Sequence, residues 1–354
     1  MSKFFDKKYA SLVPYTPGEQ PKERKYIKLN TNESPFPPSP YALRLAREAA
    51  GDLMLYSDPE CHELRSITAK KFGVDRDEII FTNGSDEVLN FAFMAFCGEN
   101  TPAVFPNITY GFYPVFAEVN GIKYKEIPLN DDFSINVDDY INKSATVFIA
   151  NPNAPTGKVL SLAEVEKIVA SNPENIVVID EAYVDFGGET AIPLIKKYNN
   201  LLVTRTFSKS YSLAGGRLGF GIASKEIIKD LNTVRFSTNP YNVNRMTAAA
   251  GIGAISDEEY FKDNIAKIIA TRERTATALK ELGYAVIDSK TNFLFVKHPT
   301  LGGEEVYKKL RENGILVRHF DKAEITDYNR ITVGSDEEMD SLIFVAKQIA
   351  EGEI

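Results

Sequence analysis

Short, continuous apolar segments rich in β-branched residues recur along the first two thirds of the chain. They lie at 78–82, 102–105, 122–129, 145–150, 175–180, 201–207 and 218–223. Apolar segments of this length, without polar alternation, predict strands that are buried on both faces. Amphipathic helical patterns separate them, for example at 39–53 and 63–73. Because strands that alternate with helices form mostly parallel sheets, we expect an α/β domain whose central, mostly parallel sheet is flanked by helices.

The pattern changes near residue 245. A long helical pattern at 257–283 is followed by short, spaced strand patterns at 284–289, 292–298, 314–320 and 330–334. This order is typical of a smaller α+β domain. The first 30 residues are polar and contain three prolines, which favours an extended arm. We therefore expect an N-terminal arm (1–30), a large domain (31–246) and a small C-terminal domain (247–354).

Composition excludes several classes of protein. The chain of 354 residues has a net charge of −8 and no basic block that could follow a phosphate backbone, so we expect no nucleic-acid partner. The longest apolar stretch, 91–97, is far too short to cross a bilayer, and the N-terminus does not resemble a signal peptide. Two cysteines 36 positions apart and three scattered histidines predict no disulfide scaffold and no metal site, which fits a cytoplasmic protein.

Two charged residues directly follow predicted strands, where ligands of open α/β sheets bind. Asp180 ends the strand at 175–180; it is either a helix cap or structural ion pair, or the partner of a protonated ring nitrogen. Lys209 follows the strand at 201–207. Most lysines are solvated surface residues, but a partly buried lysine in a cation-rich pocket becomes a nucleophile. Ser208 and Arg217 beside it suit a phosphate.

Five further residues follow the same rule. Ser85 and Asp86 begin a helix directly after a strand, so they either cap it or offer free N–H groups to an anion. Asn153 lies in a rigid loop after the strand at 145–150, and Tyr110 and Tyr183 follow two other strands. Each has an ordinary structural explanation. Together with Lys209 and Asp180 they match what pyridoxal phosphate requires: a lysine, an acid, a phenol, a stacking aromatic ring and a phosphate cup.

Three motifs carry a resemblance to a known family. The segments "NPNAPTG" (151–157), "DEAYVDF" (180–186) and "RTFSKSYSLAGGRLGF" (205–220) resemble the class I and II aminotransferases of fold type I. Within this family the resemblance is closer to the histidinol-phosphate aminotransferases, and it covers nearly the whole chain, through "KLNTNESPFPPSP" (28–40) to "NRITVG" (329–334).

The resemblance implies a role for each candidate residue. Lys209 would bind the cofactor covalently and carry protons, Asp180 would pair with the ring nitrogen, and Tyr183 would bond the 3′ oxygen. Tyr110 would stack on the ring, and Tyr56 would reach the cofactor phosphate of the partner subunit in a homodimer. The residues implied for the cofactor phosphate are Ser85, Asp86, Ser208 and Arg217. Those implied for the substrate are Tyr15, Asn32, Glu33, Arg318 and Arg330.

One position departs from the family pattern. Most relatives have asparagine immediately before "PTG", where this chain has Ala154, and we expect Asn153 to take over the contact with the ring oxygen. The resemblance implies interconversion of histidinol phosphate, a phosphorylated amino alcohol, and imidazole acetol phosphate, with 2-oxoglutarate and glutamate as the second pair. The alternatives are a lyase such as a threonine-phosphate decarboxylase, an aminotransferase for aromatic or other amino acids, a non-catalytic effector domain, and a dehydrogenase suggested by "GGRLGFG".

Overall fold

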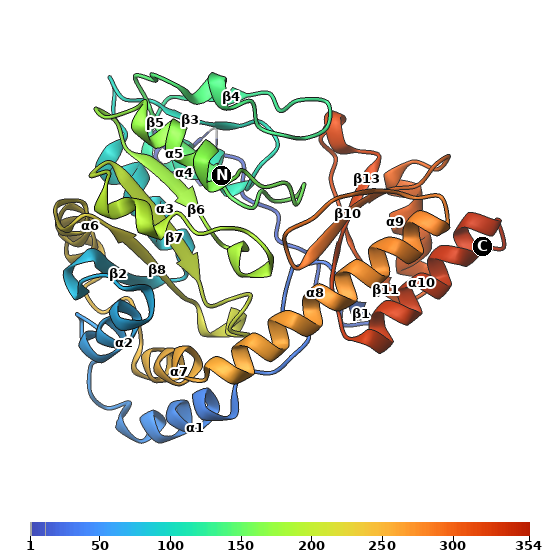
Figure 1. Cartoon of the computed structure of the whole chain (residues 1–354), viewed down its shortest axis with the longest axis horizontal. Coiled ribbons are helices and arrows are strands. Elements are labelled where there is room, and N and C mark those ends of the chain that lie inside the picture. Colours follow the sequence, from blue (N-terminus) through green and yellow to red (C-terminus); the bar gives the residue numbers. More distant parts are fainter. Residues whose placement is uncertain (1, 11) are drawn as a thin grey trace.

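A seven-stranded sheet forms the centre of the larger part of the molecule (Figure 1). The structure is a computed structural model that describes residues 2–10 and 12–354. In spatial order the strands are β2 (Ile79–Asn83), β8 (Leu218–Ala223), β7 (Leu201–Thr206), β6 (Val177–Asp180), β5 (Thr146–Ala150), β3 (Ala103–Pro106) and β4 (Tyr124–Ile127). Within the described residues β8 runs antiparallel to both of its neighbours, and the other pairs are parallel. The predicted α/β sheet is confirmed, strand by strand.

Helices cover both faces of this sheet, which explains the unbroken apolar strands. Successive residues of β5 point to opposite faces, so that Val147 and Ile149 join one hydrophobic cluster and Phe148 joins the other. The first cluster includes side chains of α1 (Pro40–Ala49), α2 (His62–Phe72), α5 (Leu162–Ala170) and α7 (Arg245–Ser256). The second includes side chains of α3 (Ser85–Phe96), α4 (Phe112–Asn120) and α6 (Lys225–Thr238).

A smaller antiparallel sheet lies beside the first. Its strands, in order, are β12 (Arg318–His319), β13 (Tyr328–Thr332), β10 (Phe293–Lys297) and β9 (Ala285–Ile287). A third cluster joins it to α9 (Gly303–Glu312), α10 (Asp336–Glu351) and the end of α8 (Glu258–Glu281), which leads from the large sheet to the small one (Figure 1). The predicted boundary after residue 246 falls inside α7. This helix packs closely on α1 of the large domain, since a Cβ at Gly253 would lie 2.5 Å from Ala42 Cα. The division of the chain into an arm and two domains stays a prediction.

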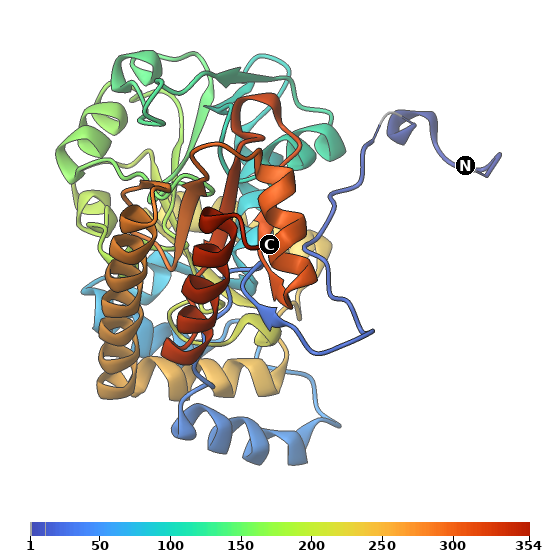
Figure 2. The same ribbon diagram turned by 90° about the vertical axis from the view of Figure 1, so that its right-hand side faces the viewer.

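The N-terminal segment contributes one strand to a separate two-stranded sheet and then runs toward the large sheet. Residues near the N-terminus extend away from the rest of the molecule (Figure 2), and β1 (Ile27–Lys28) then pairs in parallel with β11 (Ile315–Leu316). Leu29 is buried in the small-sheet cluster, and the next residues enter the space between the two sheets. Within the described residues, no helix is long and apolar enough to span a membrane.

Candidate active site

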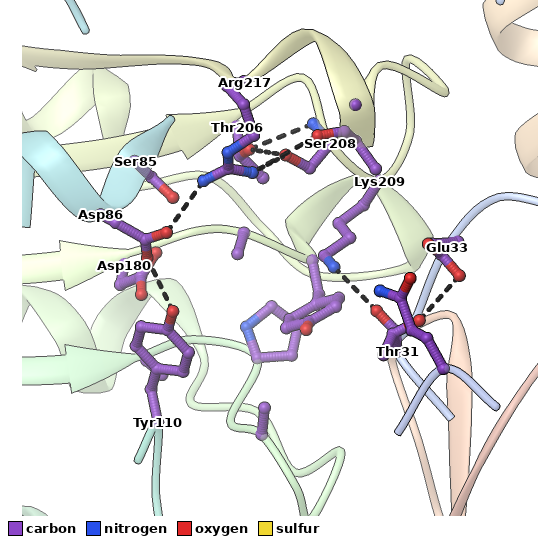
Figure 3. Close-up of a pocket in the computed structure, with 18 residues that line it drawn as sticks. Thr31, Glu33, Ser85, Asp86, Tyr110, Asp180, Thr206, Ser208, Lys209 and Arg217 are labelled. Atoms are coloured by element: carbon purple, nitrogen blue, oxygen red, sulfur yellow. Dashed lines mark hydrogen bonds and ion pairs between the residues drawn. The ribbon is translucent and has the colours of Figure 1, made fainter. Parts of the chain in front are cut away.

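Two adjoining cavities of about 410 and 370 Å³ lie at the carboxyl ends of the parallel strands. Figure 3 shows the first of them. Both are lined by Lys209, Tyr183 and Tyr110, together with Thr31 and Ala154. This is the edge of the sheet where ligands of α/β proteins bind. Most of the residues that sequence patterns placed after separate strands are therefore brought together in space.

Lys209 enters the site from the loop that follows β7. Its Nζ donates a hydrogen bond of 3.2 Å to the carbonyl oxygen of Thr31 on the N-terminal segment. Burial, and next the positive charge of Arg330, lower the pKa of Lys209 to about 8. A lysine with this pKa is neutral in a sizeable fraction of molecules near neutral pH, as a nucleophile or base must be.

Asp180 is the last residue of β6 and is only 4% exposed. Its carboxylate accepts hydrogen bonds from Thr204 Oγ1 (3.0 Å) on the neighbouring strand and from Tyr113 Oη (3.1 Å) on α4. Burial raises the pKa of Asp180 to about 6, against the effect of these two hydroxyl groups. A buried carboxylate that has hydroxyl partners but no cation beside it suits a cationic ring nitrogen in the cavity.

A narrow cradle for an anion lies where β2 passes into α3. Gly84 has φ = 76°, and a Cβ on it would lie 2.5 Å from Arg217 Nη2. A Cβ on Gly219 would lie 2.2 Å from the backbone nitrogen of Ser85. Glycine at position 84 thus leaves room for the Arg217 side chain, and glycine at position 219 lets β8 approach the start of α3, whose free N–H groups favour a phosphate.

Side chains complete this cradle (Figure 3). Asp86 accepts from Tyr110 Oη (2.6 Å) and from Arg217 Nη2 (3.0 Å). Ser208 accepts from Thr206 Oγ1 at 3.0 Å and lies 3.5 Å from Arg217 Nη1. The phosphate residues expected from the sequence therefore form one group, together with the hydroxyl group of Thr206. Tyr110 lines the cavity, with its hydroxyl group fixed by Asp86.

The second cavity is cationic and lies against the small sheet. Arg318 and Arg330 line it with Tyr15, and each guanidinium lies within 6 Å of the Phe320 ring centre. Arg330 donates to the Asn30 carbonyl oxygen at 3.0 Å, and its buried Nε has no hydrogen-bond partner among the described residues.

Glu33 lines the first cavity, where it accepts from Lys28 Nζ at 2.5 Å. Asn32 lines the second cavity. Lys322, which sequence patterns did not indicate, also lines the second cavity and donates to the Asn107 carbonyl oxygen at 2.7 Å.

Comparison with known proteins agrees with this geometry. Residues 24–344 match the model of the family "Aminotransferase class I and II". The chain belongs to this family. It is 50% identical over 349 residues to the histidinol-phosphate aminotransferase of Brachyspira hyodysenteriae, with 98% of each chain covered. It is 46% identical to that of Clostridium acetobutylicum, over 98% of this chain and 99% of the relative.

One similar solved structure contains a bound cofactor. The histidinol-phosphate aminotransferase of Sinorhizobium meliloti in complex with pyridoxal 5′-phosphate superposes with a TM-score of 0.90, at 27% identity, over 100% of this chain and 99% of the other. The cofactor of this aminotransferase is pyridoxal phosphate. The residues present fit it, since the cavity offers a buried carboxylate, a lysine of lowered pKa and a cradle that a Cβ at Gly219 would fill.

The structure does not bring Asn153 into the site of this aminotransferase. Its Nδ2 donates to the Ile108 carbonyl oxygen (2.9 Å) and to Thr156 Oγ1 (3.0 Å), and its Oδ1 accepts from Thr109 Oγ1 (2.8 Å). All of its polar atoms therefore hold the 151–157 loop in place. The described lining of both cavities includes Ala154 but not Asn153, which corrects the expectation that Asn153 replaces the usual asparagine.

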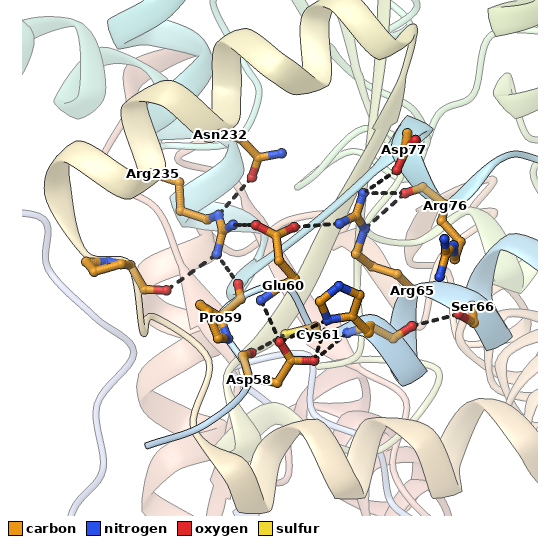
Figure 4. Close-up of polar contacts among 12 residues, drawn as sticks. Asp58, Pro59, Glu60, Cys61, Arg65, Ser66, Arg76, Asp77, Asn232 and Arg235 are labelled. Carbon is orange, nitrogen blue, oxygen red and sulfur yellow. Dashed lines mark hydrogen bonds and ion pairs between the residues drawn. The ribbon is translucent and has the colours of Figure 1, made fainter. Parts of the chain in front are cut away.

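Tyr56 also lies outside both cavities of its own chain. It is 79% exposed and stacks on Tyr241 with 4.6 Å between the ring centres. The segment that carries it is anchored by Glu60, which accepts from Arg65 Nη1 (2.6 Å) and from Arg235 Nη2 (3.3 Å), as Figure 4 shows. Its role toward a partner subunit stays a prediction.

The structure also shows an ionic network that the sequence patterns did not predict. It lies behind the strands that carry the active-site residues. Glu181, the residue after Asp180, accepts from Arg205 Nη1 at 3.3 Å, and Arg205 also pairs with Asp185. Asp185 in turn accepts from Ser210 Oγ at 2.6 Å. Because side chains alternate along strands, Glu181 and Arg205 point to the opposite side from Asp180, which lines the first cavity, and from its partner Thr204.

Proposed function

We propose that this aminotransferase interconverts histidinol phosphate and imidazole acetol phosphate, with 2-oxoglutarate and glutamate as the second pair. The observation that carries the proposal is the pair of arginines, Arg318 and Arg330, with Tyr15, in a cavity that also contains Lys209. Two guanidinium forks and a phenol suit a phosphate monoester. The names of the relatives that match at 46–50% identity support the same substrate.

Each group of site residues has its own role in this proposal. Bound pyridoxal phosphate supplies an aldehyde that condenses with amines and a ring that accepts an electron pair. We assign to Lys209 Nζ both removal of the proton from the substrate carbon and its delivery to the carbon that carries the cofactor's aldehyde, because its pKa of about 8 allows either protonation state. Asp180 holds a proton on the ring nitrogen, and the start of α3 with Arg217 holds the phosphate. Arg318 and Arg330 would hold the substrate in the cavity that Lys209 also lines.

We further propose a cytoplasmic homodimer. Four consecutive side chains, Leu53 to Tyr56, are each more than half exposed, which is unusual for large apolar residues and favours coverage by a second copy. Both cysteines, Cys61 and Cys97, are free thiols, which fits a reducing compartment. Sedimentation velocity at micromolar concentration tests the dimer, which a single species of one chain's mass would refute.

Product analysis tests the substrate. The protein is incubated with pyridoxal phosphate, histidinol phosphate and 2-oxoglutarate, and glutamate is measured. We expect glutamate to form in step with loss of histidinol phosphate, and Arg318→Gln to raise KM for this substrate at least tenfold, since a charge-assisted bond is lost. Carbon dioxide released from threonine phosphate without any keto acid would instead identify a lyase. Faster reaction with tyrosine or aspartate than with histidinol phosphate would refute the proposed substrate.

A further inference from the structure

A buried hydrogen bond joins the N-terminal segment to the active-site tyrosine. Asn32 Nδ2 donates to Tyr183 Oη at 2.9 Å. Asn32 is 1% exposed and Tyr183 is 9% exposed, so water does not compete freely for this bond. The two residues lie 151 positions apart, and the bond therefore depends on the path of the N-terminal segment between the two sheets.

The amide of Asn32 is held in one orientation from the small sheet. Thr332 Oγ1, on β13, accepts from the Asn32 backbone N–H (2.9 Å) and donates to Asn32 Oδ1 (3.1 Å). The single hydroxyl hydrogen of Thr332 is thus directed at Oδ1, which leaves Nδ2 to face Tyr183. Asn292 Nδ2 donates to the Asn32 carbonyl oxygen at 3.0 Å and fixes the backbone as well.

The backbone of Asn32 is in a left-handed conformation. It has φ = 55°, in the left-handed region that non-glycine residues rarely adopt. Asparagine adopts this conformation more readily than other residues with a side chain, and here the surroundings keep it in place. The three bonds from Thr332 and Asn292 are what hold it here.

The direction of the hydrogen bond between Asn32 and Tyr183 determines whether the Tyr183 hydroxyl group can donate to another acceptor. A phenol has one hydrogen to donate, and because Tyr183 Oη accepts from the amide, its own hydrogen is left for another acceptor. Tyr183 lines both cavities, and Lys209 Nζ lies 5.9 Å from its ring centre. Since Ala154 has no polar side-chain atom and Asn153 is turned away, neither of them can share this task.

We propose that Asn32 is a positioning residue for the cofactor: its amide sets the Tyr183 hydroxyl as a donor toward the 3′ oxygen of pyridoxal phosphate. The inference rests on the cofactor and on the site proposed above. A donor at that oxygen stabilises its negative charge, and this favours the unprotonated form of the nitrogen that links Lys209 to the cofactor. Asn32 therefore lowers the pKa of this nitrogen through Tyr183, without touching the cofactor itself.

A double-mutant cycle on the reconstituted protein tests this coupling. The visible absorption band of the lysine-linked cofactor is titrated with pH in the wild type, Asn32→Ala, Tyr183→Phe and the double variant. We expect Tyr183→Phe to raise the midpoint by about one pH unit and Asn32→Ala by roughly half a unit, as one hydrogen bond would. In the Tyr183→Phe background, Asn32→Ala should cause no further shift. Equal shifts by Asn32→Ala in both backgrounds would overturn the proposal.

Two more variants separate positioning from general damage. Thr332→Val removes the hydrogen bond that orients the Asn32 amide. It should raise the midpoint of the absorption titration in the wild-type background, and it should have no effect in the Tyr183→Phe background. It also keeps the test usable if Asn32→Ala does not fold. Asn30→Ala is the matched control, because this buried amide donates to the Glu19 carbonyl oxygen, away from Tyr183. A shift by Asn30→Ala as large as that by Asn32→Ala would refute a specific role.

The same titration distinguishes a failure of this inference from a failure of the proposed function. A wild-type protein without any visible band would refute the cofactor site itself. A band that responds to histidinol phosphate, combined with no coupling between Asn32 and Tyr183, would refute only the positioning role.

Discussion

Asp180→Asn is the substitution that most sharply separates folding from chemistry at this site. Asparagine has the shape of aspartate but no charge. The two hydrogen-bond partners of Asp180 are hydroxyl groups, on Tyr113 and Thr204, and a hydroxyl can donate to an amide oxygen or accept from an amide nitrogen. We therefore expect the fold and both bonds to survive.

The pKa of Asp180 gives the effect on stability. Burial raises it to about 6 from the ordinary 3.8, so the folded cofactor-free protein disfavours the carboxylate by about 3 kcal/mol at neutral pH. For an acid with a raised folded pKa, stability is lost as pH rises from about 4 to about 6. Asp180→Asn removes this loss, and the cofactor-free variant should melt no lower than the wild type at pH 7.

The effect on catalysis should be large and opposite. Two unit charges about 4 Å apart attract by about 4 kcal/mol at an effective dielectric constant of 20. At about 1.4 kcal/mol per factor of ten, loss of this attraction lowers the rate of the first half-reaction by roughly a thousandfold. Stopped-flow absorbance with histidinol phosphate in single turnover measures this rate directly.

Glu181→Gln provides the matched control. Glu181 is the adjacent buried carboxylate, but it pairs with Arg205 on the far side of the strands. We expect this variant to lose stability and to keep a half-reaction rate within about fivefold of the wild type. A rate for Asp180→Asn within tenfold of the wild type would refute the reasoning about Asp180.

Three other predictions follow from buried or crowded positions. Arg205→Met leaves the buried Glu181 and the partly buried Asp185 without their cation and should destabilise the protein by about 3–5 kcal/mol in urea unfolding; a loss below about 1 kcal/mol would show that the network is solvated. In Gly219→Ala the new methyl group would collide with the backbone of Ser85 and push apart the two segments that form the phosphate cradle. Pyridoxal phosphate should bind at least tenfold more weakly in an equilibrium titration, whereas unchanged affinity would place the phosphate elsewhere. His298 Nδ1 accepts from two backbone N–H groups, and burial lowers its pKa. Stability should therefore fall as pH drops below about 6.5, and His298→Asn should flatten the melting temperature between pH 5 and 7; an identical slope in both proteins would contradict this.

The sequence was informative wherever a strand ended. Each apolar segment marks a strand, and for most strands the polar residue that follows lies at the ligand-binding edge; this is why the sequence alone predicts that Lys209, Asp180 and Ser85 lie together. The motif resemblance added the separate residues of the second cavity, such as Arg318, which no local pattern marks.

Contacts that depend on register and on long-range packing could not be predicted. Thr204 meets Asp180 because β6 and β7 pair in one register, and Tyr113 arrives from a helix on the sheet face. The bond between Asn32 and Tyr183 needs both sheets in place. Asn153 was misplaced for a related reason: its side chain is used inside its own loop, and no composition signal distinguishes that from a ligand contact.

We propose that Lys209 binds pyridoxal phosphate and that the amine of histidinol phosphate takes the place of Lys209 on the cofactor. The most direct measurement is the absorption spectrum of the reconstituted protein, before and after histidinol phosphate is added without any keto acid. We predict a visible band that is lost on this addition and restored by 2-oxoglutarate, and that Lys209→Ala abolishes the turnover. A band that histidinol phosphate leaves unchanged, or a Lys209→Ala variant that turns over at the normal rate, would contradict the claim.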